Sequence, residues 1–220
     1  MKCRISAGRE AFTPPRFGTI LGDVTSPQRK LTFEEYLEFE ENSPVRHEFV
    51  AGEVYAMSGE TRRHGRIVGN LLFHLRSAAS AGRCEIYVNA IKLRVGDDVY
   101  YPDVIVTCSA TDQDDRWVRE PCLLIEVTSP STARFDRLEK LNAYRKIPSL
   151  QAYLIVEQAW RRVVRHWRDA SGVWQQDDLQ GEGAIPLSCP EVLLTLDQIY
   201  EGLAPLTVKE LEAIGYGVER

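Results

Sequence analysis

Two carboxylates stand out because each interrupts a segment that is otherwise apolar. Asp103 opens the apolar run 104–106, and Glu126 lies within the apolar run 123–127. A carboxylate in a central strand is costly to bury unless it is paired or binds a metal ion. If the two strands are neighbours, the carboxylates would repel each other unless a cation lay between them. The pair therefore predicts a divalent-metal site.

The ligand chemistry favours Mg²⁺ or Mn²⁺ as the cofactor. Carboxylate oxygens are hard ligands, and the sequence has no cluster of cysteine and histidine with the spacing of a zinc site. Each carboxylate alone also has an ordinary explanation. Glu126 could reach solvent or a salt bridge from a strand end, and a Pro-Asp pair is common where a strand begins. The prediction of a metal site therefore requires that the two carboxylates lie close together in the fold.

The elements that must position these residues predict an α/β fold. We expect a central mixed β-sheet flanked by helices in the order αβββαβ, with an N-terminal helix and β-hairpin before it and an antiparallel extension after it. The expected elements are a helix from the capping box Thr32–Glu35, a hairpin of 47–50 and 54–57, a helix at 61–81, strands at 85–95, 99–107 and 122–128, a helix at 132–146, a strand at 151–157, an antiparallel pair at 161–167 and 173–179, and a short strand and turn at 192–203. We expect residues 1–30 to be a poorly ordered extension, 31–205 a single domain, and 206–220 a tail or short helix.

Composition limits the class of protein. The chain has 220 residues, 44% of them hydrophobic, and a formal net charge of −5. Its apolar runs are too short to span a membrane, and the first ten residues lack the apolar core of a signal peptide. We therefore expect a cytoplasmic protein that is not coated in positive charge. Its five cysteines are scattered, and we expect them to be reduced thiols, mostly buried.

The ordered set of motifs resembles the PD-(D/E)XK nuclease superfamily and, more closely, the Uma-type restriction endonuclease family within it. The resemblance covers about residues 31–203. The stretches that carry it are Glu48 to Val54, His64 at the head of a helix, Tyr100 to Asp103, Leu124 to Thr132, Asp136 with Lys140 and Tyr144, and Ile147 to Tyr153.

The resemblance implies a restriction-endonuclease-like core and hydrolysis of a nucleic-acid phosphodiester. Asp103 and Glu126 would hold one or two Mg²⁺ or Mn²⁺ ions, and a lysine would orient the attacking water and stabilise the transition state. In the superfamily pattern that lysine stands two residues after the glutamate, but Thr128 stands there in this chain.

Two lysines are candidates for the missing one. Lys140 lies on the helix after the Glu126 strand, where an Asp136–Lys140 surface pair is the ordinary alternative. Lys92 would lie opposite Asp103 if residues 97 and 98 formed the centre of a hairpin turn, because cross-strand partners project to the same face. Its ordinary alternative is a solvent-facing strand lysine, and a register slip of one residue would turn it to the other face.

Glu48 and His64 complete the set of candidate site residues. The resemblance implies an additional acidic ligand near the first core helix, for which we select Glu48, with Glu60 as second choice. His64 would contact a metal-bound water or a phosphate. The ordinary alternatives are a hairpin salt bridge for Glu48 and a core or capping histidine for His64.

We expect DNA to be the substrate and a homodimer to be the active form, because two sites cut two strands most easily. Two clusters of basic residues, 62–66 and 161–168, are candidates for phosphate contacts, although the second is more typical of a solvated face. Two alternatives stay open. One is a catalytically impaired nucleic-acid-binding module, which Thr128 favours, and the other is a small-molecule phosphoesterase.

Overall fold

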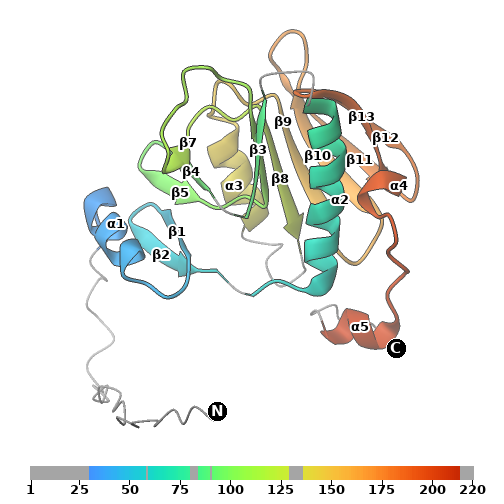
Figure 1. Ribbon diagram of the computed structural model, residues 1–220, viewed down its shortest axis with the longest axis horizontal. Helices are drawn as coiled ribbons and strands as arrows, with labels where there is room; N and C mark the ends of the chain where they lie inside the picture. Colours follow the sequence, from blue (N-terminus) through green and yellow to red (C-terminus); the bar gives the residue numbers. More distant parts are fainter. Residues whose placement is uncertain (1–29, 58, 80–83, 90, 129–135, 214–220) are drawn as a thin grey trace, which may run out of the picture.

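The computed structural model describes residues 30–57, 59–79, 84–89, 91–128 and 136–213. Its centre is a six-stranded sheet in the order β11-β10-β9-β8-β6-β3 (Figure 1). Strands β8 and β9 are parallel, and the other neighbouring pairs of this sheet are antiparallel. The predicted mixed α/β core is confirmed. The strands are β3 (Glu85–Val88), β6 (Val104–Thr107), β8 (Leu123–Thr128), β9 (Ala152–Glu157), β10 (Arg162–Arg168) and β11 (Trp174–Gln180).

Helices cover both faces at the centre of this sheet (Figure 1). They are α2 (Arg62–Ala79) and α3 (Asp136–Tyr144). Leu71 of α2 belongs to the same core cluster as Ile125, whereas Tyr144 of α3 belongs to the cluster of Leu124. All residues of β8 and β9 are buried, as expected for strands covered on both faces. Because side chains alternate along a strand, Glu126 projects with Leu124 toward α3.

A second sheet has the strand order β2-β1-β5-β4-β7, and α1 packs against it. The predicted capping box of Thr32 and Glu35 begins α1, and Tyr36 stacks on Phe49 with ring centroids 4.7 Å apart. The predicted β1–β2 hairpin is confirmed, and Gly52 in its turn has φ 88°. A Cβ there would lie 2.7 Å from the Cβ of Lys30, so the turn requires glycine. The elements are α1 (Phe33–Glu41), β1 (His47–Val50), β2 (Glu53–Ala56), β4 (Lys92–Val95), β5 (Asp98–Tyr100) and β7 (Trp117–Val118).

The strands expected at 85–95 and 99–107 are each broken in two, which corrects the prediction. Asn89 adopts a left-handed φ of 45° in the first break, and Pro102, which has no amide hydrogen to donate, lies in the second. As a result, β3 and β6 pair in the six-stranded sheet, while β4 and β5 pair in the five-stranded one. Asp103 therefore lies where the chain passes from one sheet to the other.

The C-terminal part extends the core. The predicted antiparallel pair is confirmed as β10 and β11, in which Arg165 lies opposite Asp177. The hairpin of β12 and β13 follows, and β12, which contains Pro186, was not among the predicted strands. The remaining elements are β12 (Ala184–Ser188), β13 (Glu191–Thr195), α4 (Leu196–Ile199) and α5 (Val208–Ala213). None of the described helices is long and apolar enough to cross a membrane. The extension expected at 1–30, apart from Lys30, and the chain after 213 lie outside the described residues.

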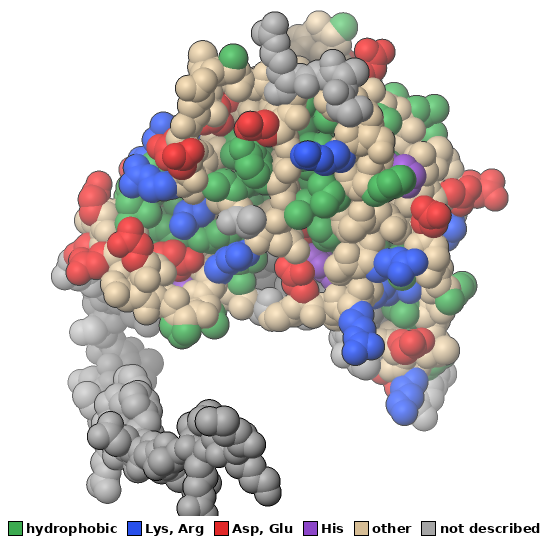
Figure 2. Space-filling model, in the orientation of Figure 1, with side chains coloured by type: hydrophobic (Ala, Val, Ile, Leu, Met, Phe, Trp, Pro, Cys, Tyr) green, Lys and Arg blue, Asp and Glu red, His purple; other side chains and the backbone are tan. Residues whose placement is uncertain are grey.

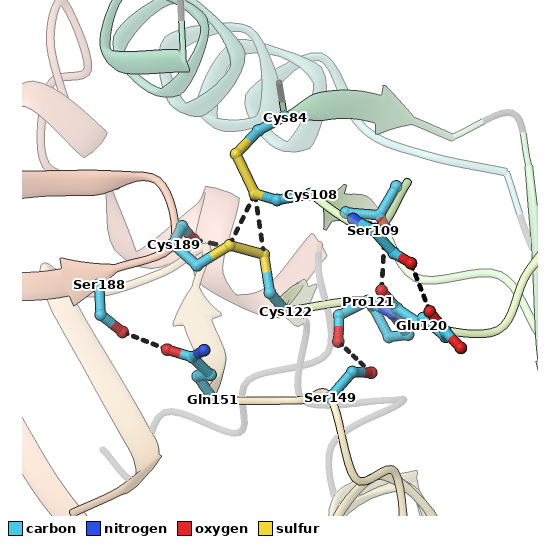
Figure 3. Close-up of a disulfide and its surroundings, with 11 residues drawn as sticks. Cys84, Cys108, Ser109, Glu120, Pro121, Cys122, Ser149, Gln151, Ser188 and Cys189 are labelled. Atoms are coloured by element: carbon cyan, nitrogen blue, oxygen red, sulfur yellow. Dashed lines mark hydrogen bonds between the residues drawn. A yellow bond between two sulfur atoms is a disulfide. The ribbon is translucent and has the colours of Figure 1, made fainter. Parts of the chain in front are cut away.

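The prediction of reduced cysteines is wrong for four of the five. Cys84 is bonded to Cys108, and Cys122 to Cys189 (Figure 3). The partners are separated by 24 and 67 residues, so no local spacing indicates the pairing. The remaining cysteine, Cys3, lies outside the described residues.

Candidate active site

Asp103 and Glu126 are brought together by the pairing of β6 with β8. Val104 lies opposite Ile125, and one further step in this register places Asp103 level with Glu126. The Oδ2 atom of Asp103 accepts a hydrogen bond of 2.6 Å from the backbone N–H of Val127. Both carboxylates are buried. The sequence pattern required them to come from neighbouring strands, and the structure places them so.

Glu126 is bound by two side chains of α3. Its Oε1 accepts hydrogen bonds from the Lys140 ammonium, at 3.2 Å, and from the Tyr144 hydroxyl, at 3.0 Å. The Lys140 Nζ also lies 2.9 Å from Oε1 of Glu48. The side chains of Glu48, Glu126 and Lys140 are only 10–12% exposed. One buried ammonium therefore lies between two carboxylates.

His64 contacts the other side of Asp103. Its Nε2 is 3.1 Å from Oδ1 of Asp103, and its Nδ1 is 3.1 Å from Oε2 of Glu60. The imidazole is buried at the start of α2, where its backbone N–H donates to the Thr61 hydroxyl. Glu60, the second choice for the additional acid, thus lies within ion-pair distance of His64, while Glu48 contacts Lys140.

Lys92 does not lie beside Asp103, which corrects the predicted register. The pairing of Leu93 with Tyr100 centres the turn on Gly96 and Asp97, one residue earlier than expected. Lys92 is therefore level with Tyr101, and its Nζ lies 5.8 Å from the centroid of that ring. Of the two candidate lysines, the structure brings only Lys140 to the carboxylates.

Comparison with known proteins identifies the family. Residues 33–198 match the model of the family described as "Uma2: Putative restriction endonuclease". This chain belongs to the Uma2 family. The predicted resemblance is confirmed, and it extends to two uncharacterized proteins of Synechocystis sp. strain PCC 6803. The protein slr1290 is 33% identical over 183 residues, covering 82% of this chain and 96% of its own length. The protein sll1609 is 34% identical over 166 residues, covering 73% and 94%.

A solved structure supports the fold of this Uma2 protein. The crystal structure of "a putative nuclease belonging to DUF820" from Anabaena variabilis superposes with a TM-score of 0.66 and covers 77% of this chain and 97% of that one. The sequences are 13% identical, so the likeness is one of fold. The restriction-endonuclease-like fold class is confirmed.

Two sets of donor atoms surround Asp103. Glu48, Asp103 and Glu126 supply carboxylates from three segments of the chain, and the Glu48 and Glu126 oxygens contact the Lys140 ammonium. Carboxylate oxygens are the ligands that Mg²⁺ and Mn²⁺ prefer. Glu60, His64 and Asp103 also present ligand atoms that lie within 4.8 Å of one another. Asp103 is common to both sets. Carboxylates gathered in this way repel one another, and a cation offsets that repulsion.

The electrostatics of the site follow from its burial. Burial raises the pKa of Glu126 to about 8, the Lys140 charge opposes this shift, and the charges of Asp103 and Glu48 add to it. Burial acts to lower the pKa of His64, but its hydrogen bond to Asp103 and the surrounding carboxylates outweigh burial, so that pKa is raised. Without a metal ion, both groups therefore hold protons more tightly in the folded chain than in the unfolded one.

These shifts predict that the metal-free protein loses stability as the pH rises. A folded state that binds more protons than the unfolded state is destabilised when protons are removed. His166, whose pKa burial lowers to about 4, has the opposite effect, but only below its ordinary value of 6.5. Between pH 6.5 and about 8 we expect the free energy of unfolding to fall by about 1 kcal/mol per pH unit, measured by urea denaturation in chelator. The substitution Glu126→Gln should flatten this slope, and a flat wild-type profile would contradict the prediction.

Tyr144 also contacts Glu126, a contact that was not among the predictions. The signal was present, because Lys140 and Tyr144 are four residues apart and so share one face of α3. The Tyr144 ring is fully buried and packs edge-on against Tyr100 and Tyr153. This packing fixes the hydroxyl that donates to Glu126.

The two basic clusters have different environments. In the second cluster, Arg161, Arg162 and Arg165 form ion pairs with Asp197, Asp178 and Asp177. In the first cluster, Arg62 and Arg66 are exposed near His64. Figure 2 shows Lys and Arg side chains gathered on the lower right of the molecule, over the start of α2 and α5. The first cluster is the better candidate for contacts with phosphates.

Proposed function

We propose that this protein is a Mg²⁺- or Mn²⁺-dependent endonuclease that hydrolyses phosphodiester bonds of DNA. The observation that carries the proposal is the convergence of Glu48, Asp103 and Glu126 with Lys140 at one buried end of the sheet, in a chain of the Uma2 family. Family membership alone leaves open whether the chain retains the chemistry. The convergence supports that it does, because it supplies both the acidic ligands and the ammonium.

The proposal assigns a role to each side chain. Asp103, Glu126 and Glu48 would hold the divalent ion, with His64 adjacent. When bound, the ion polarises the scissile phosphate and lowers the pKa of a water molecule. Lys140 would orient the attacking water and stabilise the charge that develops on the phosphate. Tyr144 positions Glu126 through its hydroxyl, which donates to the same oxygen as Lys140.

Lys140 supplies the ammonium that is missing because Thr128 stands two residues after Glu126. The side chain of Thr128 lies on the same face of β8 as Glu126, because the two are two residues apart. A lysine at 128 would bring an ammonium to that face from the strand. In this chain α3 brings the Lys140 ammonium to Glu126 across that face instead. We infer that the position of the catalytic ammonium is retained although the sequence motif is not.

The substrate and setting are part of the proposal. Arg62 and Arg66 would contact backbone phosphates near the site, which would make DNA affinity fall with salt concentration. A homodimer would place one site on each strand of a duplex. A chromosomal or foreign DNA substrate is consistent with action in the cytoplasm.

The proposed function predicts nicking of supercoiled plasmid by the full chain in Mg²⁺ or Mn²⁺ and no nicking in chelator. Agarose electrophoresis measures the conversion, and p-nitrophenyl phosphate hydrolysis is measured beside it. Hydrolysis of the small ester without nicking would show a phosphoesterase instead. Binding of labelled duplex in a gel-shift assay, with no cleavage in either metal, would show a catalytically impaired binding module.

A further inference from the structure

Four cysteines from four separate segments meet near the start of β8 (Figure 3). Glu126 lies further along that strand. Cys84 precedes β3, Cys108 follows β6 and Cys122 precedes β8. Cys189 lies in the turn between β12 and β13. The two disulfides are therefore not isolated crosslinks but neighbours at a single point, where the central sheet meets the C-terminal hairpin.

The sulfur atoms of the two disulfides are in direct contact through Cys108. Its Sγ lies 2.9 Å from Sγ of Cys189 and 3.6 Å from Sγ of Cys122. The Sγ atoms of Cys84, Cys108 and Cys189 all lie within 4.8 Å of one another. In a tetrahedral zinc site with Zn–S bonds of about 2.3 Å, the sulfurs are about 3.8 Å apart. The separations of 2.9 and 3.6 Å between the pairs are shorter than this, so the four sulfurs would surround one ion after side-chain movements that widen the cluster.

We propose that, when both disulfides are reduced, the thiolates of Cys84, Cys108, Cys122 and Cys189 bind one Zn²⁺ ion. Each disulfide takes two electrons and two protons from a dithiol reductant, which is itself oxidised to a disulfide. Zinc then displaces the four thiol protons, and four Zn–S bonds form. Thiolate sulfur is a soft ligand and selects zinc over the hard ions that suit the carboxylate site.

The surroundings of the cluster suit a structural metal site. Cys122 and Cys189 are buried, whereas Cys84 and Cys108 are half-buried, so an ion can enter from the side of the second pair. The nearby polar groups are bonded elsewhere: the Ser188 hydroxyl donates to Gln151, and the Ser149 hydroxyl donates to the Pro121 carbonyl (Figure 3). The sulfurs are thus the donors of this cluster. Either the disulfides or the metal would hold the β12–β13 hairpin to the central sheet.

The test is the zinc content of the full chain purified in a dithiol reductant and then equilibrated with zinc and desalted. We expect about one zinc per chain by elemental mass spectrometry, and four thiols that react with a thiol reagent only after a chelator is added. Cys189→Ser should lose the zinc. Cys3→Ser changes the one cysteine that is not among the four proposed ligands and should keep the zinc, as should Glu126→Gln, which alters only the carboxylate site.

A second measurement covers the possibility that Cys189→Ser does not fold. Co²⁺ added to the reduced wild-type chain should give the absorption bands of tetrahedral thiolate coordination, and equimolar Zn²⁺ should abolish them. The proposal is overturned if the reduced, folded chain shows four freely reactive thiols and no bound zinc. It is also overturned if zinc remains in Cys108→Ser and Cys189→Ser at the wild-type level.

Discussion

Glu126→Gln should reduce metal-dependent plasmid nicking by at least about 100-fold, because loss of a group that only supports a metal ligand already costs 10–100-fold. The amide is nearly isosteric with the carboxyl and cannot supply the negative charge that holds a divalent ion. The measurement is the initial rate of conversion of supercoiled plasmid in Mn²⁺. Glu191→Gln makes the same chemical change at an exposed position of β13 and should leave the rate unchanged.

Thermal unfolding shows whether Glu126→Gln loses activity because it no longer binds the metal ion or because it no longer folds. The raised pKa of Glu126 means that the folded site accepts an uncharged side chain readily. Glu126→Gln should therefore unfold at a temperature no lower than the wild type in chelator. It should also lose most of the increase in melting temperature that Mn²⁺ gives the wild type, since a ligand stabilises only the state that binds it. Full nicking activity in Glu126→Gln would show that the nuclease centre lies elsewhere.

Lys140→Met should lower the nicking rate by about 10²–10⁴-fold, the usual contribution of a group that transfers or positions a proton in the transition state. Lys92→Met is the matched control, because it removes the same charge from a lysine that lies over the Tyr101 ring. It should leave the rate unchanged. Equal losses in the two variants would show that the ammonium between Glu48 and Glu126 has no special role.

Lys140→Met also leaves two buried carboxylates without their shared cation. Removing one partner of a buried ion pair can cost about 3–5 kcal/mol. Because the pKa of Glu126 is already raised, that carboxyl can become neutral by binding a proton, so the metal-free variant should be less stable than the wild type by less than this amount. Added Mg²⁺ should restore more stability to Lys140→Met than it adds to the wild type, because the metal replaces the missing positive charge. The comparison, made by thermal unfolding with and without Mg²⁺, ensures that the rate is measured on folded protein.

The fold was largely predictable because its signals are local. The capping box at Thr32, the apolar stripe of α2 and the uninterrupted apolar run of β8 depend on residues close together in the chain. The breaks at Asn89 and Pro102 were harder to predict. A strand that passes from one sheet to another keeps its alternating pattern, so only the pairing partners reveal the division.

The candidate site, like the fold, was predictable only where its signals are local in the sequence. The sequence indicated Asp103 and Glu126 as unusual carboxylates, since an acid within an apolar run is conspicuous without any structure. It left Lys92 and Lys140 as equal candidates, because a hairpin register that shifts by one turn residue moves Lys92 from Asp103 to Tyr101. Register is decided by the packing of whole strands, which no short stretch of sequence contains.

By itself, the sequence determined which elements form and which carboxylates must find a partner, because helix and strand periodicity and the cost of burying charge act locally. The tertiary structure alone decided which lysine meets Glu126 and that Cys84, Cys108, Cys122 and Cys189 gather at one point. These contacts join segments 14 to 81 residues apart. Their geometry depends on how the two sheets and α3 pack together, and that packing is set by the core as a whole.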